Sequence, residues 1–138
     1  MLVRKWLLDT NVLLAALINP GILPEDAKAL LQDRRNTIYF SAASIWEIAI
    51  KHSLVREDFD FEPQDIHQLA IETGFTELPV ESMHCYPLGQ MVWHHRDPFD
   101  RLLVAQARSI PAFILTTDSV LRHYSSELIK VVHFKARS

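Results

Sequence analysis

The feature that most constrains the fold is the alternation of two kinds of apolar segment along the chain. Short runs with β-branched and aromatic residues are typical of buried strands, and they alternate with segments whose apolar residues recur at helical spacing. The strand-like runs cover residues 3–8, 37–40, 75–80, 113–116 and 129–133. Because strands that alternate with helices form parallel sheets, we expect an α/β fold built on one parallel sheet.

Start and stop signals place the helices between these runs. Thr10 or Asn11 can cap the first helix, and Asp97 followed by Pro98 is a typical start of another. Pro87 interrupts one helical pattern, so we expect a disturbed helix around it. The expected helices cover residues 12–18, 24–35, 44–53, 64–73, 81–91 and 98–109, with a short helix starting at Asp118.

Length and composition indicate one domain, residues 1–138. The chain has 138 residues, 49% of them hydrophobic, with no internal repeat or linker. No apolar run approaches a membrane span, and the start lacks the long apolar stretch of a signal peptide. Because it has only one cysteine, the chain can form no intramolecular disulfide, which suits the reducing cytosol. We expect a cytoplasmic protein with no membrane partner.

Four acidic residues stand where apolar runs stop: Asp9, Glu47, Asp100 and Asp118. Asp9 and Asp118 follow strand-like runs, and ligands of open parallel sheets bind at the carboxyl ends of strands. Glu47 and Asp100 lie near predicted helix starts, which point to the same edge in right-handed crossovers. Converging carboxylates repel one another unless a hard divalent cation binds between them. The pattern therefore indicates a metal site.

Each acid also has a purely structural interpretation. The spacing of Ser44 and Glu47 matches a capping box, which would turn Glu47 back to the start of its helix. Asp100 would lie in a first helical turn, where the helix dipole favours negative charge. Asp118 can cap the following helix, and Asp9 can bind the amides of the turn after it. Considered singly, the structural interpretation is favoured for Glu47 and Asp118, whereas for Asp9 and Asp100 the structural and the metal-binding interpretations are equally favoured.

Four motifs resemble the PIN-domain ribonucleases, and most of all the VapC-type toxins of bacterial and archaeal toxin–antitoxin pairs. These motifs are LLDTNVLL, SxxSxxEI from Ser41 to Ile48, DPFDRLLVAQA and LTTD. They occur in the order typical of the family and at fitting separations, and the resemblance spans nearly the whole chain. Residues 54–93 contain no motif of this kind.

The resemblance implies a PIN-like three-layer α/β/α domain with a central parallel sheet of four to five short strands. It implies that Asp9, Glu47, Asp100 and Asp118 are the catalytic, metal-binding acids, in that order. Bound Mg²⁺ or Mn²⁺ would activate a water that hydrolyses RNA phosphodiester bonds, leaving a 5′-phosphate and a 3′-hydroxyl. Flanking residues that could orient the carboxylates or their waters are Thr10, Asn11, Asp97, Thr117 and Ser119. Of the four acids, Glu47 is the one most expected not to touch the ion, because of its capping box.

The resemblance also implies partners: an RNA substrate, a cognate antitoxin protein and a second copy of the chain in a homodimer. The formal net charge of −3 is not typical of nucleic-acid binding. It does not exclude RNA, however, because a bound cation and a local basic patch can attract phosphate.

Two other functions stay open. A magnesium-dependent phosphatase or a receiver-like domain also gathers acids at strand ends. Against these, Asp9-Thr10-Asn11 is not the DxD motif of common aspartate-nucleophile phosphatases, and no lysine follows a late strand as in receivers. A catalytically degenerate PIN binding module is the other alternative, although such a module has no need to keep four acids.

Overall fold

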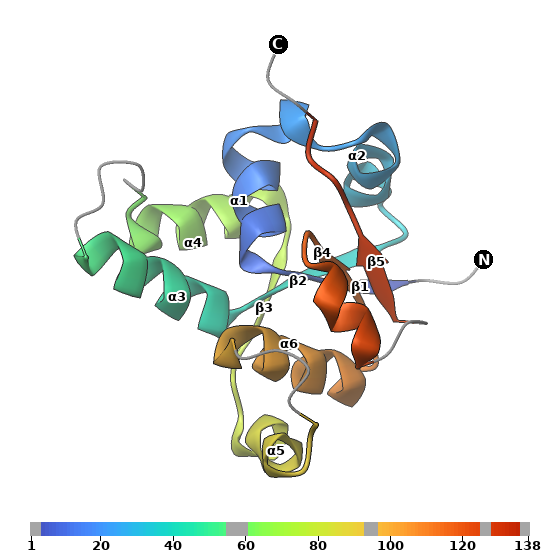
Figure 1. The fold of residues 1–138 in the computed structure, drawn as a ribbon. Helices are drawn as coiled ribbons and strands as arrows, with labels where there is room; N and C mark the ends of the chain where they lie inside the picture. Colours follow the sequence, from blue (N-terminus) through green and yellow to red (C-terminus); the bar gives the residue numbers. More distant parts are fainter. Residues whose placement is uncertain (1–3, 55–60, 93–96, 125–127, 136–138) are drawn as a thin grey trace.

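The computed structural model describes residues 4–54, 61–92, 97–124 and 128–135, and its centre is a five-stranded sheet. The strand order is β3-β2-β1-β4-β5 and every pairing is parallel, which confirms the expected sheet (Figure 1). Val3, at the start of the first predicted strand, lies outside the described residues. The strands are β1 (Lys5–Leu8), β2 (Thr37–Ser41), β3 (Thr76–Leu78), β4 (Phe113–Thr116) and β5 (Ile129–Val131).

The central strands read as continuous apolar runs because both faces of the sheet are covered. Successive side chains of β1 point to opposite faces, so Trp6 and Leu8 enter one hydrophobic cluster and Leu7 enters another. In β4, likewise, Leu115 joins the first cluster and Ile114 the second. The core is therefore split by the sheet into two layers.

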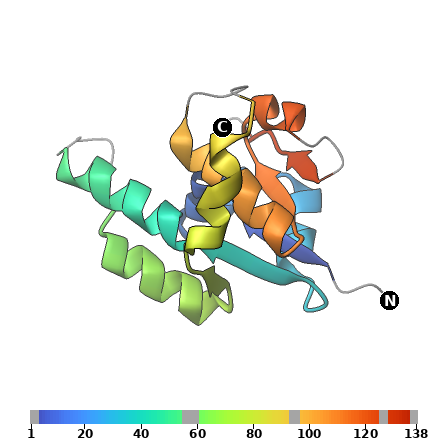
Figure 2. The ribbon, with the colours of Figure 1, turned by 90° about the horizontal axis from the view of Figure 1, so that it is seen from below.

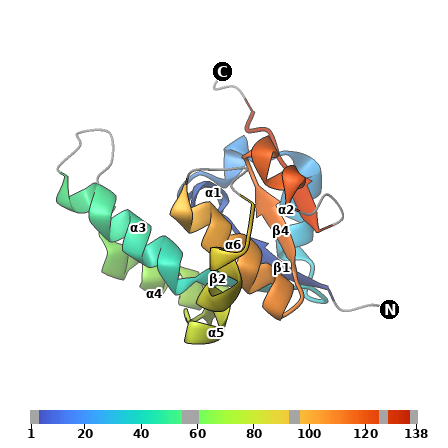
Figure 3. The same ribbon diagram turned by 60° about the horizontal axis from the view of Figure 1, so that its bottom comes forward.

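Helices cover the two faces and complete the three-layer α/β/α arrangement (Figures 1 and 2). Side chains of α1 (Thr10–Ile18), α2 (Glu25–Gln32), α3 (Ala42–Ser53) and α4 (Pro63–Thr73) pack into the first cluster, and those of α6 (Pro98–Ser109) into the second. The helices α3 and α4 lie side by side and extend away from the sheet (Figure 3). The remaining short segments are η1 (Pro20–Ile22), α5 (Ser82–Cys85), η2 (Tyr86–Gly89) and η3 (Ser119–His123).

Several helix boundaries differ from the prediction. The first helix is capped by Asp9, not by Thr10 or Asn11, because the carboxylate of Asp9 accepts from the backbone N–H of Val12. The helix expected over 81–91 ends at Cys85, and a 3₁₀ turn follows. Pro87 accounts for this early stop, since it has no N–H to continue an α-helix. The helix expected from residue 24 begins at Glu25.

The strand order has a switch point between β1 and β4. From β1 the chain proceeds to β2 and then to β3 on one side of the sheet, and it returns to place β4 and β5 on the other. Such a reversal opens a crevice at the carboxyl ends of the two adjacent strands. Among the helices of the described residues, none is both long and apolar enough to cross a membrane.

Candidate active site

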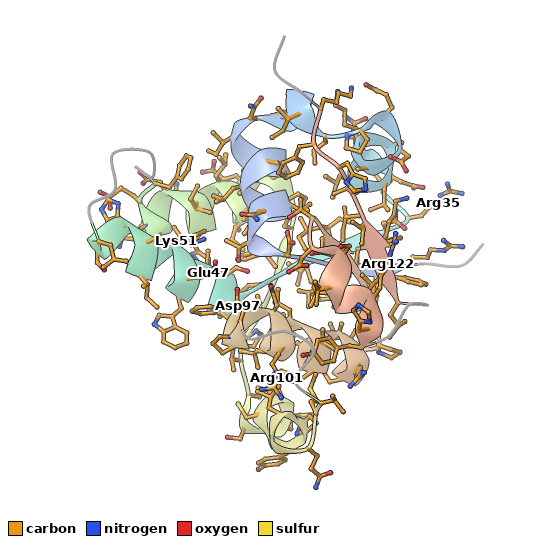
Figure 4. All side chains as sticks on the ribbon, viewed as in Figure 1. Arg35, Glu47, Lys51, Asp97, Arg101 and Arg122 are labelled. Atoms are coloured by element: carbon orange, nitrogen blue, oxygen red, sulfur yellow. The ribbon has the colours of Figure 1, made fainter. Side chains whose placement is uncertain are left out.

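A cavity of about 210 Å³ lies at the switch point, beyond the carboxyl ends of β1 and β4. In the part of the chain that the structure describes, every predicted site residue except Ser119 lines this cavity. The lining residues are Asp9, Thr10, Asn11, Glu47, Lys51, Asp97, Asp100, Thr117 and Asp118. Figure 4 shows two of the acids, Glu47 on α3 and Asp97 before α6, near one another although they come from different elements.

Asp9 is the buried centre of this site, with only 5% of its surface exposed. Its Oδ1 accepts from the backbone N–H of Val12 at 2.7 Å, which caps α1. Its Oδ2 accepts from the hydroxyl of Thr116 at 2.5 Å and from the backbone N–H of Thr117 at 3.0 Å. The carboxylate is thus fixed between the first strand and the fourth.

Burial raises the pKa of Asp9 above its ordinary value of 3.8, and the negative charge of Glu47 adds to the rise. The hydrogen bonds from Thr116, Val12 and Thr117 lower that pKa without cancelling the effect of burial. Because the folded chain binds this proton more tightly, the contribution of Asp9 to stability is fully present below pH 3.8 and is lost as the pH rises through the raised pKa. The ionised site therefore favours a bound cation.

The capping box predicted for Ser44 and Glu47 is wrong. The helix begins at Ala42 with Ser41 as its cap, so Ser44 lies inside the first turn and Glu47 in the second. Glu47 consequently faces the cavity instead of the helix start. Its Oε1 accepts from the hydroxyl of Thr10 at 2.7 Å, and its Oε2 pairs with Nζ of Lys51 at 2.9 Å.

The start of α6 supplies two more acids. Asp97 caps the helix, as predicted, by accepting from the backbone N–H of Phe99 at 2.9 Å. Asp100 lies in the first turn, and both carboxylates line the cavity. Arg101, the next residue, is buried and turns elsewhere, because its guanidinium donates to the carbonyl oxygens of Leu88 and Met91. A cap and a site residue are therefore compatible roles at this helix start.

The end of β4 supplies the last acid. Asp118 caps η3 by accepting from the backbone N–H of Val120 at 2.9 Å, and its own N–H donates to the hydroxyl of Thr116 at 3.0 Å. Beside it, the hydroxyl of Thr117 accepts from the side-chain amide of Asn11 at 3.4 Å. These contacts tie the loop after β4 to the start of α1.

The donor set of the cavity suits a hard divalent cation. Carboxylate and hydroxyl oxygens are the ligands that Mg²⁺ and Mn²⁺ prefer, and the lining offers both. Within the described ranges, no three acidic, histidine or cysteine side chains already stand close enough to hold a metal ion. The hydrogen bonds of Asp9 and the ion pair of Glu47 hold these two carboxylates to protein partners.

Comparison with protein-family models matches the PIN domain over residues 6–127. The chain belongs to the PIN domain family. PIN domains are generally nucleases, so membership implies hydrolysis of phosphodiester bonds. The match includes all five acids of the cavity.

Solved structures support the PIN fold. A chain of VapBC2 from Rickettsia felis, bound to a DNA fragment from their promoter, gives a TM-score of 0.67 at 14% identity, over 94% of this chain and 100% of that one. A domain of a functionally unknown protein from Methanocaldococcus jannaschii gives a TM-score of 0.62 at 18% identity, over 98% of this chain and 95% of that one. A chain of VapBC-1 from nontypeable Haemophilus influenzae gives a TM-score of 0.60 at 18% identity, over 93% of this chain and 98% of that one. Curated proteins give no significant match.

Sequence reasoning missed Thr116, the residue whose hydroxyl joins Asp9 to the loop of Asp118 in this PIN domain. The LTTD motif contains two threonines, and the sequence favours Thr117, the one next to the acid. The signal that distinguishes them is the strand register. Leu8 pairs with Leu115, which places Thr116 opposite Asp9, and a register of this kind is not readable from one sequence.

Thr116→Val tests this connection, because it keeps the shape of the side chain and removes both hydrogen bonds. We expect a loss of about 1–3 kcal/mol in the free energy of unfolding, since buried polar groups lose their partners. We expect divalent-metal affinity and nuclease activity to fall by about 10- to 100-fold. Denaturant titration and calorimetry measure the two effects. The matched control is Thr73→Val, because Thr73 is an exposed residue of α4 whose hydroxyl also donates a hydrogen bond. Wild-type metal affinity in Thr116→Val would contradict the role of Thr116 in orienting Asp9.

Proposed function

We propose that this PIN domain is a Mg²⁺- or Mn²⁺-dependent endoribonuclease and the toxin of a toxin–antitoxin pair. The observation that carries the proposal is the convergence of five carboxylates in one cavity at the switch point of the sheet. They come from four places in the chain, so local capping alone does not explain why they meet. The acids are Asp9, Glu47, Asp97, Asp100 and Asp118.

Asp9, Glu47, Asp100 and Asp118 would hold the ion. When bound, the ion supplies a water acidic enough to attack at neutral pH and offsets the charge of the phosphate. Thr116 and the backbone N–H of Thr117 keep Asp9 oriented, and Thr10 does the same for Glu47. Asp97 holds the start of α6, which fixes the position of Asp100.

The supporting residues form two bridges between the elements that carry the acids. Thr10, whose hydroxyl lies 3.0 Å from that of Ser44, joins α1 to α3 beside Glu47. Asn11 and Thr117 join α1 to the loop after β4 on the other side of Asp9. Since the carboxylates sit on separate elements, these bridges keep their relative positions when substrate enters the cavity.

A cytoplasmic antitoxin and a second copy of the chain are the proposed protein partners. Two of the structural neighbours come from VapBC toxin–antitoxin complexes. In this chain Trp46 and Ile50 on α3 and Leu54 at its C-cap follow one another at four-residue spacing, with exposed fractions of 61%, 37% and 61%. An exposed apolar stripe of this kind marks a protein-binding surface.

The nuclease proposal is tested with purified protein and labelled RNA. We expect cleavage of single-stranded RNA or tRNA with Mg²⁺ or Mn²⁺, no cleavage with excess EDTA, and recovery when the metal is returned. Asp100→Asn should fold normally and lose the activity, because an amide is a poor ligand for a hard cation. Gel electrophoresis with 5′-end analysis measures the products. A folded wild-type chain that binds metal and cleaves no RNA would favour the degenerate binding module instead, and hydrolysis of a small phosphomonoester alone would favour the phosphatase.

A further inference from the structure

Lys51 is the one basic residue in the described lining of the cavity, among five acids. A nucleic acid is a polyanion, and a cavity rimmed by carboxylates repels it unless positive charge compensates. Figure 4 shows Lys51, Glu47 and Asp97 following one another from the outer part of α3 toward the start of α6. Lys51 therefore lies on the α3 side of the cavity, and 37% of its side chain is exposed.

Both oxygens of Glu47 are engaged by neighbouring side chains. Nζ of Lys51 lies 2.9 Å from Oε2, and the hydroxyl of Thr10 donates to Oε1 at 2.7 Å. A divalent cation that binds Glu47 must compete with the ammonium group of Lys51, which is itself a cation. The lysine acts on Glu47 as an internal counterion.

The lysine can change partners at little cost. Its side chain is 37% exposed, and the pair with Glu47 joins residues one turn apart on α3. Water can solvate the ammonium group as it turns away, whereas the Glu47 side chain is only 15% exposed and needs the incoming cation in place of the lysine. The ammonium group sits on a flexible four-carbon stem and carries three donors, so it can turn to a phosphate without movement of the helix.

We propose that Lys51 is a substrate-binding residue with two successive partners. It pairs with Glu47 in the cation-free chain, and it binds a phosphate of the nucleic acid when Glu47 ligates a divalent cation. The inference rests on the nuclease function proposed above. It assigns to Lys51 a role in binding the substrate, and none in the chemical step.

The first arm of the test measures Mn²⁺ binding by calorimetry, with no nucleic acid present. Lys51→Gln removes the competing charge, so we expect Mn²⁺ to bind about two- to fivefold more tightly. Lys51→Arg keeps the charge and should bind Mn²⁺ like the wild type. The matched control is Lys28→Gln, because Lys28 also pairs with a glutamate of its own helix, the exposed Glu25 on α2, and lies outside the cavity lining.

The second arm measures binding of a short fluorescein-labelled single-stranded RNA by fluorescence anisotropy in the presence of Ca²⁺. A gel checks that the RNA stays intact. For Lys51→Gln we expect about tenfold weaker binding and a salt slope smaller by about 0.7, the value for one lost phosphate contact. Lys51→Arg should keep the slope, and Lys28→Gln should match the wild type. In cleavage assays with Mg²⁺, the defect of Lys51→Gln should appear in KM and leave kcat nearly unchanged.

The outcomes separate this inference from the proposed function. An active wild type together with unchanged RNA affinity and salt slope in Lys51→Gln overturns the role of Lys51 and leaves the nuclease intact. Tighter Mn²⁺ binding without any loss of RNA affinity also overturns it, because Lys51 would then be only a counterion. A wild type that neither binds nor cleaves RNA overturns both.

Discussion

In Asp9→Asn, we expect metal-dependent RNA cleavage to fall by more than about 100-fold, because residues that only orient a metal ligand already contribute 10- to 100-fold. The amide cannot supply the anionic oxygen that a hard cation needs. It can still accept from the backbone N–H of Val12, and asparagine caps helices about as well as aspartate. Activity should therefore be lost while α1 stays formed.

The stability of Asp9→Asn reflects two opposing effects. Removing a buried charge whose pKa is raised by burial stabilises the cation-free chain. The amide nitrogen would face the backbone N–H of Thr117, which then lacks an acceptor and costs about 1–3 kcal/mol. We expect a net change of less than about 2 kcal/mol in the free energy of unfolding.

The matched control for this substitution is Asp26→Asn on α2. Asp26 is exposed and pairs with Lys130, so its loss should change stability by less than about 0.5 kcal/mol and leave cleavage intact. Single-turnover cleavage and thermal melts with and without Mn²⁺ measure the difference. If Asp9→Asn keeps a tenth or more of wild-type activity, Asp9 is not an essential ligand.

Phe40→Ala should cause the largest loss of stability, about 3–5 kcal/mol in the free energy of unfolding. Phe40 is fully buried in β2, and its ring meets His67 of α4 edge-on, with centroids 5.9 Å apart. Alanine leaves a cavity between the sheet and α4 that the rigid parallel strands cannot close. A loss of this size is a large part of the 5–15 kcal/mol typical of a whole domain.

Guanidinium titration followed by circular dichroism measures this effect, and Phe40→Leu is the matched control. Leucine keeps most of the buried volume, so it should cost less than about 1.5 kcal/mol. Because β2 leads directly into the helix that carries Glu47, Phe40→Ala should also weaken metal binding. A loss below about 1 kcal/mol would mean that the layer between the sheet and α4 repacks freely.

The sequence contained most of the fold because its signals are local. β4 has the predicted bounds, Phe113–Thr116, because a short buried run follows Pro111 and ends before Thr117 and Asp118. Asp97 and Pro98 placed the start of α6 correctly, since both act within one helical turn. The convergence of Asp9 and Asp118 followed from a general property of parallel sheets. Their role as metal ligands stays a prediction.

What the sequence did not contain are choices that distant residues decide. Ser41 and Ser44 both suit a helix start, and Ser41 is the cap because β2 extends to it and its hydroxyl donates to Gln106, 65 residues away. The sequence does not single out Thr116, because its importance depends on the register of β1 and β4. The sequence does not place Lys51 at the site, since spacing alone does not tell which face of α3 borders the cavity.

The pairing of β1 with β4 has a consequence for the chain while it is still being made. Asp9 and the threonine that fixes it are 107 residues apart, and β1 lacks one of its two neighbours until β4 has left the ribosome. At ordinary rates of synthesis the nascent chain carries its first acid for roughly 5–20 s before the last one exists. A nuclease whose site needs all four acids would stay inactive beside its own messenger RNA until the segment that carries Asp118 has been made.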